Sequence, residues 1–554
     1  MKNKLMKTVT VMIVALAMIV SVLSVGAADT NGQGETSVGD SVVLGTEPIN
    51  GKITVTGLAK GDVAYLYKVI DIEYNADTNN VTKEWSKDVE QFVEKHNWGS
   101  VEETFENQEG GFTELAKKLY ADLVTDIFAL TGTPNWMAVK TAGDSAEVAR
   151  DMIGIEANES VVFDENIGLG QYMVIVTGKN VYAPMTATIE PEVNEENQYI
   201  VYPNVNIVAK ASNPKLDKSI VDGTHGTEND SVAIGDTVEF SLTTQVPAFP
   251  VEAVDKTFRL IDTMEDGIVG ANDIKIVIES TKRVLELDKD YTVAYYNADG
   301  QTTEPENASK FKIDLLINNC PDVNGQTITV TYNSEVTAEI VPGTAEVNKV
   351  TLIWPKNVWE AIDKKVPENT EPEDTDEYNK LEDQVKVYTY GLKILKTDGK
   401  DPLKGAAFKI LKGSEKGPEV DFVMKEKGSY RVAEPGEESV HTDLQCNDKA
   451  ELTLAGLDEG TYYIVETVVP SGYVQAKPQK ITITDKADTD ELTGKAQESN
   501  EDNAYADATF VNKKGFNLPK TGGAGTAIFT LIGVALMGGA LLLVVRMRKA
   551  NGAK

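Results

Sequence analysis

Hydrophobic and polar residues alternate along most of the chain with a spacing of two, which is the pattern of strands buried on one face. Between residues 84 and 151 the spacing changes to three and four, as expected for an amphipathic helix. That stripe is made of Phe112, Leu115, Leu119, Leu123, Ile127 and Leu130. The alternating segments around it are 52–57, 63–69, 160–163, 172–177, 181–189 and 199–208. We therefore expect a β-sandwich with a helical insertion whose apolar stripe packs on the sandwich.

Two more blocks of alternating segments follow, separated by turn residues at regular intervals. An acidic, proline-containing stretch at 367–376 is predicted to be an exposed loop between them. The pattern predicts a mainly β protein of three tandem immunoglobulin-like sandwich domains, at 29–210, 211–384 and 385–514. The strands expected in the second block are 216–221, 237–246, 257–261, 274–279, 291–296, 311–317, 327–340 and 347–354.

The N-terminus carries the pattern of a secretory signal peptide. Three lysines precede an apolar run at 9–25, and the small residues Gly26, Ala27 and Ala28 follow it. We expect residues 1–28 to be removed when the protein is exported.

The C-terminus carries a second apolar run, at about 523–545, followed by Arg546, Arg548 and Lys549. Its length suits one transmembrane helix, and the basic residues would stay on the cytoplasmic side. Directly before it stands the pentapeptide Leu518-Pro519-Lys520-Thr521-Gly522. Its proline fixes one backbone dihedral and has no N–H, so an extended segment is expected.

This order of pentapeptide, apolar helix and basic tail, at 515–554, resembles the cell-wall sorting signal of Gram-positive surface proteins. The resemblance implies that a membrane transpeptidase, a sortase, attacks the carbonyl of Thr521 and releases everything from Gly522 onward. The protein would then be joined to peptidoglycan. The alternative is an ordinary single-pass anchor with an accidental pentapeptide.

The composition fits an exported β protein and argues against several functions. The chain holds 53 Lys and Arg against 87 Asp and Glu, a net charge of −34, so nucleic acid is not an expected partner. His96, His225 and His441 lie in different blocks without the spacing of a metal site or a hydrolytic triad. No metal, cofactor or enzymatic activity toward another molecule is expected. Cys320 and Cys446 fall in different predicted domains, so a disulfide between them is not expected.

The third block places three polar residues where apolar residues are expected. Residues two apart in a strand share a face, and Lys396, Glu466 and Asn512 each share a face with apolar neighbours. Burying a lone lysine or glutamate costs several kcal/mol unless something compensates. The apolar neighbours are Leu392, Ile394, Tyr462, Ile464, Ala508 and Phe510.

Five segments of this block together resemble the collagen-adhesin B-type repeat and the pilin E-box. The resemblance implies that the Lys396 amine attacks the side-chain carbonyl of Asn512, ammonia leaves, and an amide joins the first and last strands. A dry core favours neutral groups, which makes the lysine nucleophilic and lets Glu466 protonate the carbonyl. The alternative is a buried Lys–Glu ion pair beside an amide. The segments are 392–399, 403–408, 460–467, 470–473 and 508–512.

The second block repeats this arrangement in another order of strands. Lys218, Asp262 and Asn348 each lie on the apolar face of a predicted strand. The pattern Ile-Gly-Asp-Thr-Val-Glu-Phe at 234–240 resembles the A-type isopeptide domain of fimbrial subunits. The resemblance implies a second amide, between Lys218 and Asn348, with Asp262 as the acid. Lys215 is a possible rival to Lys218 but falls on the opposite face.

The first block offers no such set of residues. Its segment 170–177 aligns with 460–467 but carries Val176 in the position of the glutamate. Its opening strand has Thr54 and Thr56 instead of an inward lysine. No crosslink is expected there.

The signal peptide, three sandwiches, E-box and sorting signal together resemble the major, or backbone, subunit of a sortase-assembled Gram-positive pilus. The resemblance implies a secreted protein that forms the shaft of a cell-surface pilus, anchored in the cell wall after a transient stay in the membrane. Its partners would be sortase, other pilin subunits of the same kind and peptidoglycan. Host or matrix ligands are left open.

One departure from the family's pattern concerns polymerisation. In that family a lysine in a Tyr-Pro-Lys motif accepts the next subunit, whereas here Asn204 follows Tyr202 and Pro203. Lys210 and Lys215, a short way downstream, are the candidates for this role. On the pleat, Lys210 avoids the face of Val205 and Ile207. If neither lysine serves, the alternative is a monomeric wall-anchored adhesin, or a basal or tip pilin, built from the same modules.

Overall fold

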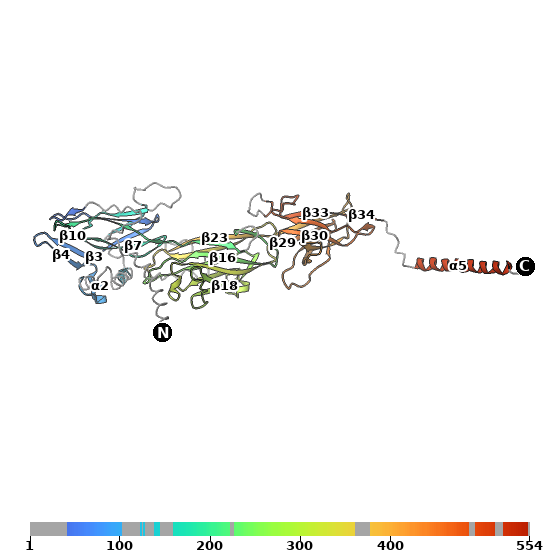
Figure 1. Cartoon of the computed structure of the whole chain (residues 1–554), viewed down its shortest axis with the longest axis horizontal. Helices are drawn as coiled ribbons and strands as arrows, with labels where there is room; N and C mark the ends of the chain where they lie inside the picture. The colour runs from blue at the N-terminus through green and yellow to red at the C-terminus, as the bar shows by residue number, and fades with distance from the viewer. Residues whose placement is uncertain are drawn as a thin grey trace.

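The computed structural model describes residues 41–101, 122–124, 126–127, 138–143, 159–221, 227–360, 377–486, 494–515 and 524–551. Three β-rich regions follow one another along the long axis, and helix α5 continues beyond the third (Figure 1). The predicted mainly β fold of tandem sandwiches is confirmed. The predicted signal peptide, residues 1–28, and the pentapeptide at 518–522 lie outside the described residues, and the domain boundaries stay predictions.

The first region packs two sheets on a common core. One sheet has the order β4-β3-β7-β9, with β5 also paired to β3, and the other has the order β12-β2-β6. A third, small sheet, β1-β11-β10, lies at the end of the region farthest from the second region (Figure 1). The strands are β1 (Val42–Val43), β2 (Lys52–Leu58), β3 (Val63–Asn75), β4 (Asn80–Trp85), β5 (Ala138–Thr141), β6 (Glu159–Phe163), β7 (Gly170–Thr177), β8 (Val181–Tyr182), β9 (Met185–Ile189), β10 (Pro191–Val193), β11 (Tyr199–Val201), β12 (Asn204–Val208) and β13 (Ala211–Ser212).

The described part of the predicted helical insertion packs on this region. Helix α2 (Glu90–His96) buries Phe92, and Leu123 and Ile127 of the predicted apolar stripe are buried in the same cluster as Val69 of β3. The range predicted to be helical also contains a strand, β5, which corrects the prediction. This four-residue segment pairs with the start of β3, so a long-range pairing decides its conformation.

The second region is a sandwich of a four-stranded sheet, β14-β16-β21-β18, and a six-stranded sheet, β15-β23-β22-β17-β20-β19. The pleat of β16 and β21 turns every second residue into the core, as the alternation in sequence predicts. The strands are β14 (Leu216–Ile220), β15 (Asn229–Ser231), β16 (Thr237–Gln245), β17 (Arg259–Met264), β18 (Ile268–Ile278), β19 (Tyr291–Tyr296), β20 (Lys310–Leu315), β21 (Thr327–Val336), β22 (Glu346–Pro355) and β23 (Tyr378–Tyr388).

The third region packs a five-stranded sheet, β26-β27-β29-β24-β33, on a four-stranded sheet, β28-β25-β30-β32, and adds a β31-β34 pair. Its first and last long strands, β24 and β33, pair in parallel, with Lys396 opposite Phe510. The strands are β24 (Tyr390–Thr397), β25 (Ala407–Lys412), β26 (Phe422–Glu426), β27 (Ser429–Val432), β28 (Leu444–Gln445), β29 (Glu451–Leu457), β30 (Gly460–Val468), β31 (Tyr473–Val474), β32 (Gln479–Ile483), β33 (Tyr505–Val511) and β34 (Lys513–Lys514).

Hydrogen bonds join each region to the next. At the first junction, Gly178 N donates to Lys356 O at 2.9 Å and Trp354 Nε1 donates to Lys179 O at 3.1 Å. At the second junction, Ile234 N donates to Gly456 O at 3.1 Å. A side chain at Gly456 would place its Cβ 2.3 Å from Ile234 Cδ1, so this contact requires glycine.

Helix α5 (Ala524–Asn551) projects past the third region at the C-terminal end (Figure 1). Its segment Phe529–Lys549 is long and apolar enough to cross a bilayer, and it packs against no other part of the described protein. The helix lies where the sequence predicts a transmembrane segment.

Candidate crosslinking sites

Two lysines are completely buried in the described protein, one in each of the second and third regions. Lys218 lies on β14 and Lys396 on β24, and both side chains have no exposed surface. The pleat explains both positions, because each lysine shares an inward face with apolar residues of its strand. Each therefore needs a polar partner inside the core.

In the second region the structure brings Lys218, Asp262 and Asn348 together, as predicted. Lys218 Nζ forms an ion pair with Asp262 of β17 and donates to the hydroxyl of Tyr332 at 2.8 Å. The same hydroxyl donates to Asp262 Oδ1 at 2.9 Å and accepts from Asn348 Nδ2 at 2.8 Å. Tyr332, on β21, thus contacts all three predicted residues.

Tyr332 does not stand out in the sequence. Its strand alternates regularly, so the tyrosine reads as one more core residue. The signal that could have found it is its hydroxyl, because a buried tyrosine usually finds a hydrogen-bond partner. Rings of Phe240 and Tyr332 also flank the amine, with Nζ of Lys218 at 5.3 Å from each centroid.

Burial sets the electrostatics of this site. Removal from water lowers the pKa of the Lys218 amine and raises the pKa of the Asp262 carboxyl, although the attraction between the two acts in the opposite sense. Burial also raises the pKa of Tyr332 well above its usual value. Burial therefore favours the neutral amine and the neutral acid more strongly than water does.

In the third region Lys396, Glu466 and Asn512 also meet, but with different contacts. Asn512 Nδ2 donates to both carboxylate oxygens of Glu466, at 2.8 and 2.9 Å. Lys396 Nζ lies 3.9 Å from Glu466 Oε1 and donates more weakly to the carbonyls of Thr397 and Phe510, at 3.4 and 3.3 Å. Burial lowers the pKa of the Lys396 amine.

Both asparagines leave one buried atom unsatisfied. Oδ1 of Asn348 and Oδ1 of Asn512 have no hydrogen-bond partner among the described residues. Leaving a buried acceptor without a donor costs about 1–3 kcal/mol. A half-turn of the Asn512 amide would exchange its oxygen and nitrogen and set Oδ1 against Glu466, where a protonated carboxyl could donate to it.

Each site therefore holds an amine, an amide carbonyl and an acid away from water. These are the groups needed for an amine to displace ammonia from an amide. The first region has no equivalent: Val176 is buried where the aligned acid would stand, and the buried polar side chains described there include no lysine. Thr54 and Thr56 are half-buried on β2.

The two lysines proposed from sequence as polymerisation acceptors are both exposed. Lys210 follows β12, on the outward side with Val208, and Lys215 precedes β14. The Lys215 carbonyl accepts a hydrogen bond from the Thr244 hydroxyl at 2.6 Å, and the Lys215 side chain lies on the face opposite the buried Lys218.

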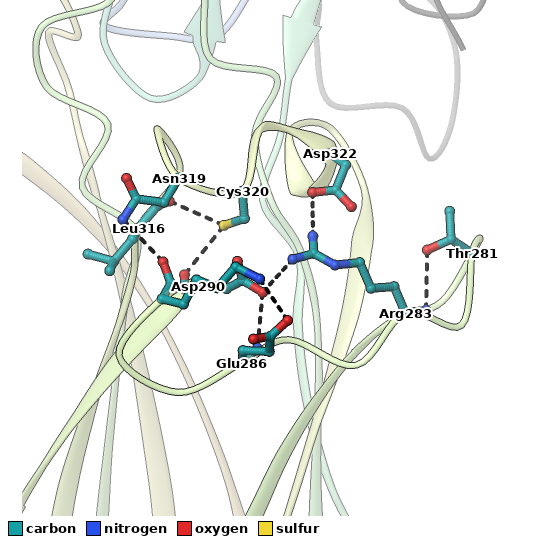
Figure 2. Close-up of polar contacts among 9 residues, drawn as sticks. Thr281, Arg283, Glu286, Asp290, Leu316, Asn319, Cys320 and Asp322 are labelled. Carbon is teal, nitrogen blue, oxygen red and sulfur yellow. Dashed lines mark hydrogen bonds and ion pairs between the residues drawn. The ribbon is translucent and has the colours of Figure 1, made fainter. Parts of the chain in front are cut away.

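Both cysteines are buried and unpaired. Cys320 lies in a loop of the second region, where its thiol donates to the carbonyls of Leu316 and Asp290 at 3.2 and 3.4 Å (Figure 2). Arg283 joins Asp290 and Asp322 beside it (Figure 2). Burial raises the pKa of Cys320 and of Cys446 to about 11, so both thiols are protonated at neutral pH.

Two family models match the C-terminal part of the chain. Residues 391–498 match the SpaA family, described as a prealbumin-like fold domain, and residues 511–551 match the LPXTG cell wall anchor motif. The predicted sorting signal is confirmed. Among the described residues, no group of His, Cys, Asp and Glu is placed to hold a metal ion.

In sequence, the chain is similar to the trypsin-resistant surface T6 protein of Streptococcus pyogenes serotype M6. The two are 26% identical over 390 residues, which cover 62% of this chain and 70% of the relative. The chain resembles Gram-positive pilins, as its sequence motifs predict.

Solved structures of pilins are also similar. The T6 backbone pilin of serotype M6 Streptococcus pyogenes, described as a modular three-domain structure, aligns with a TM-score of 0.50 and 18% identity over 78% of this chain and 79% of that chain. The full-length major pilin SpaD of Corynebacterium diphtheriae aligns with a TM-score of 0.46 and 18% identity, over 84% and 98% of the two chains.

Proposed function

We propose that this protein is the structural shaft subunit of a cell-surface pilus, polymerised and anchored to peptidoglycan by sortase at Thr521. The observation that carries the proposal is the pair of buried lysine–acid–asparagine sites in successive β regions of a chain that ends in an anchor motif. The signal peptide at 1–28, the export that it implies and the domain boundaries at 210 and 384 belong to the same proposal.

Each site closes its own crosslink. The neutral amine of Lys218 or Lys396 attacks Cγ of Asn348 or Asn512, and the Cγ–Nδ2 bond breaks. Asp262 or Glu466 takes a proton from the attacking amine and passes it to the departing nitrogen, which leaves as ammonia. The acid is unchanged at the end, and a neutral amide replaces the buried amine.

The crosslinks suit a subunit that is pulled from both ends. Tension enters the second region before Lys218 and can pass directly to Asn348, so residues 219–347 carry none of it. In the third region the bond from Lys396 to Asn512 shields residues 397–511 in the same way. The first region, without a crosslink, is the part that tension reaches unprotected.

Intact-mass measurement tests the crosslinks. The secreted protein should weigh less than its sequence by about 17 Da for each bond, two in all, because each releases one ammonia. Fragment spectra should join the peptides of Lys218 and Asn348, and those of Lys396 and Asn512. A full sequence mass would leave buried ion pairs as the correct description of both sites.

Digests of the cell wall test the anchor. A branched peptide that ends at Thr521 is expected, and recovery of surface protein that retains Gly522 would contradict sortase processing. One observation favours the alternative, a monomeric wall-anchored adhesin: Asn204 stands where the resembled family has its linking lysine. A ladder of covalent polymers on the wild-type cell surface decides for the pilus shaft.

A further inference from the structure

The two ends of the molecule carry opposite charges around exposed valines. The end of the first region farthest from the C-terminus, which we call the apical surface, carries the small sheet β1-β11-β10 (Figure 1). Valines of this sheet are 45–57% exposed. Exposed glutamates of β10 and of the turn after it lie beside them. The members of this surface are Val42, Val43, Val193, Glu192, Glu195 and Glu196.

The opposite end of the molecule, which we call the basal surface, lies where the chain leaves the third region toward α5 (Figure 1). It exposes Val474 and Val511, by 56% and 44%. Exposed lysines surround these valines, and the turn at 398–401 adds one exposed lysine and one exposed aspartate. The lysines of β34 and of the segment after β31 are Lys513, Lys514 and Lys477.

Complementary ends of this kind favour head-to-tail contact between copies. Such a contact is heterologous and does not close on itself, so it extends into a filament. Valines meet valines, and lysines of one copy meet glutamates of the next. The occupant of the apical surface is thus the basal surface of a second copy.

One exposed lysine stands beside the apical surface. Lys52 opens β2, and β12 pairs with β2 in parallel, with Asn204 opposite Lys52. The Lys52 N–H donates to Pro203 O at 2.8 Å, which fixes its backbone. Its side chain is exposed, and its amine has no hydrogen-bond or ion-pair partner among the described residues.

Two other lysines lie on strands toward this end, but both amines are occupied. Lys68 pairs with Asp71 at 2.7 Å, and Lys83 pairs with Glu190 at 2.8 Å. Each of these amines must leave its carboxylate partner before it can attack a carbonyl carbon. Lys52 is therefore the better acceptor at the apical end.

The length of the C-terminal tail before the cleavage site favours Lys52 over Lys210 and Lys215 as the acceptor. The tail from residue 515 through Thr521 has seven residues and can span at most about 25 Å. From Asn204 to Lys210 the chain advances about 20 Å along β12, which is nearly the whole reach of that tail. A copy stacked on the apical surface reaches Lys52, whereas Lys210 and Lys215 require two copies to overlap side by side.

We infer that Lys52 is the acceptor through which one copy of this chain is joined to Thr521 of the next. The inference rests on the proposed function. The donor is the thioester between the Thr521 carbonyl of one copy and the cysteine of the sortase. Lys52 Nζ forms an amide with that carbonyl carbon, the C–S bond breaks, and the proton lost by the amine returns the cysteine to its thiol.

To test this, the full chain is expressed together with its sortase, and Lys52→Arg is compared with three matched variants. Arginine keeps the charge and most of the length, but its guanidinium stays protonated and does not attack a thioester. The controls are Lys60→Arg, at the other end of the same strand, Lys210→Arg and Lys215→Arg. We expect the polymer ladder to disappear only in Lys52→Arg, which should be secreted at the wild-type level and resist protease equally.

A second measurement needs no variant. Digests of wild-type polymer should yield a branched peptide in which the Lys52 amine carries the peptide that ends at Thr521. A ladder that persists in Lys52→Arg, or a branch at another lysine, overturns the inference and leaves the pilus shaft intact. Absence of any ladder from wild type, with monomers released by wall digestion, overturns the proposed function and this inference with it.

Discussion

The second and third regions build their sites from the same three kinds of side chain but place them differently in the sandwich. In the second region the lysine and the amide, Lys218 and Asn348, come from opposite sheets. In the third region Lys396 lies on β24, and Asn512 directly follows the neighbouring parallel strand, β33. The proposed crosslink would therefore fasten sheet to sheet in the second region and first strand to last strand in the third.

The acids differ in a related way. Asp262 pairs with its lysine directly and reaches the amide through Tyr332, whereas Glu466 contacts its amide directly and stands 3.9 Å from its lysine. Aspartate is shorter by one methylene, so a hydroxyl bridges the remaining gap. In each site the acid is thus coupled to both the lysine and the amide, by direct contact or through one hydroxyl.

The largest expected effect comes from removing the acid of the third region. Glu466→Ala should raise the mass of the protein by the ammonia that is no longer lost, beyond the change in the residue itself. It also leaves Lys396 buried without its compensating charge, which costs about 3–5 kcal/mol when a buried pair is broken. Mass spectrometry and thermal unfolding of the third region measure the two effects.

The exposed Glu426→Ala, on β26, is the matched control and should change neither quantity. The parallel variant Asp262→Ala should affect only the second region. If Glu466→Ala still forms its bond, the acid has no part in the reaction and the two sites are not equivalent.

The next effect depends on whether the crosslinked asparagine lies next to an edge strand or in an interior strand of its sheet. β33 is an edge strand paired only with β24, whereas β22, which carries Asn348, lies between β23 and β17. Asn512→Ala should therefore raise hydrogen exchange at Tyr505–Val511 by at least about tenfold, because a freed edge strand opens locally. Asn348→Ala should raise exchange in β22 much less. Equal effects in both strands would contradict the assigned difference in topology.

Strand periodicity predicted most of this arrangement. Successive residues of a strand point to opposite faces, and one face of each strand is buried. This alternation predicted the inward positions of Lys218, Asp262, Asn348, Lys396 and Asn512. It also placed Glu466 on the inward face, because its strand alternates regularly up to that residue and the register shift comes directly after it.

Long-range pairing explains what the sequence analysis left out. β23 lies partly in a stretch of mixed charge after the acidic loop, and it becomes a strand because it pairs along the full length of β22. Tyr332 joins the site only when β21 stands beside β16. The pairing of Lys52 with Asn204 joins segments about 150 residues apart, and no local pattern encodes that register.

Tyr332→Phe tests the hydroxyl bridge of the second region. The variant keeps the ring against Phe240 and Phe311 but removes the only described contact that links Asp262 to Asn348. We expect slower bond formation in the second region by about 10–100-fold, since one hydrogen bond to a charged group is worth about 1.5–3 kcal/mol. Freshly made protein should then show a mixture of one and two bonds.

The third region has no such hydroxyl and should close its bond at the wild-type rate. Tyr295→Phe, at a half-buried tyrosine of β19 in the second region, is the control. Complete crosslinking of fresh Tyr332→Phe would mean that Asp262 acts on Asn348 without the bridge.

The smallest effect tests whether the second and third regions unfold independently of each other. Asp458 of the third region accepts a hydrogen bond from Ser231 of the second, and burial raises its pKa to about 6. A carboxyl whose folded pKa lies above its unfolded value stabilises the fold most below the unfolded value, near pH 4. That stability is lost as the pH rises through about 6, by at most about 3 kcal/mol for two pKa units.

We expect the melting temperature of the third region to fall between pH 4 and pH 7 in wild type. It should change less in Asp458→Asn, whose amide oxygen can still accept the hydrogen bond from Ser231. The exposed Asp443→Asn should keep the wild-type slope. If the second region melts together with the third and shares its pH dependence, the junction couples the two sandwiches, and their crosslinks stabilise one cooperative unit instead of two.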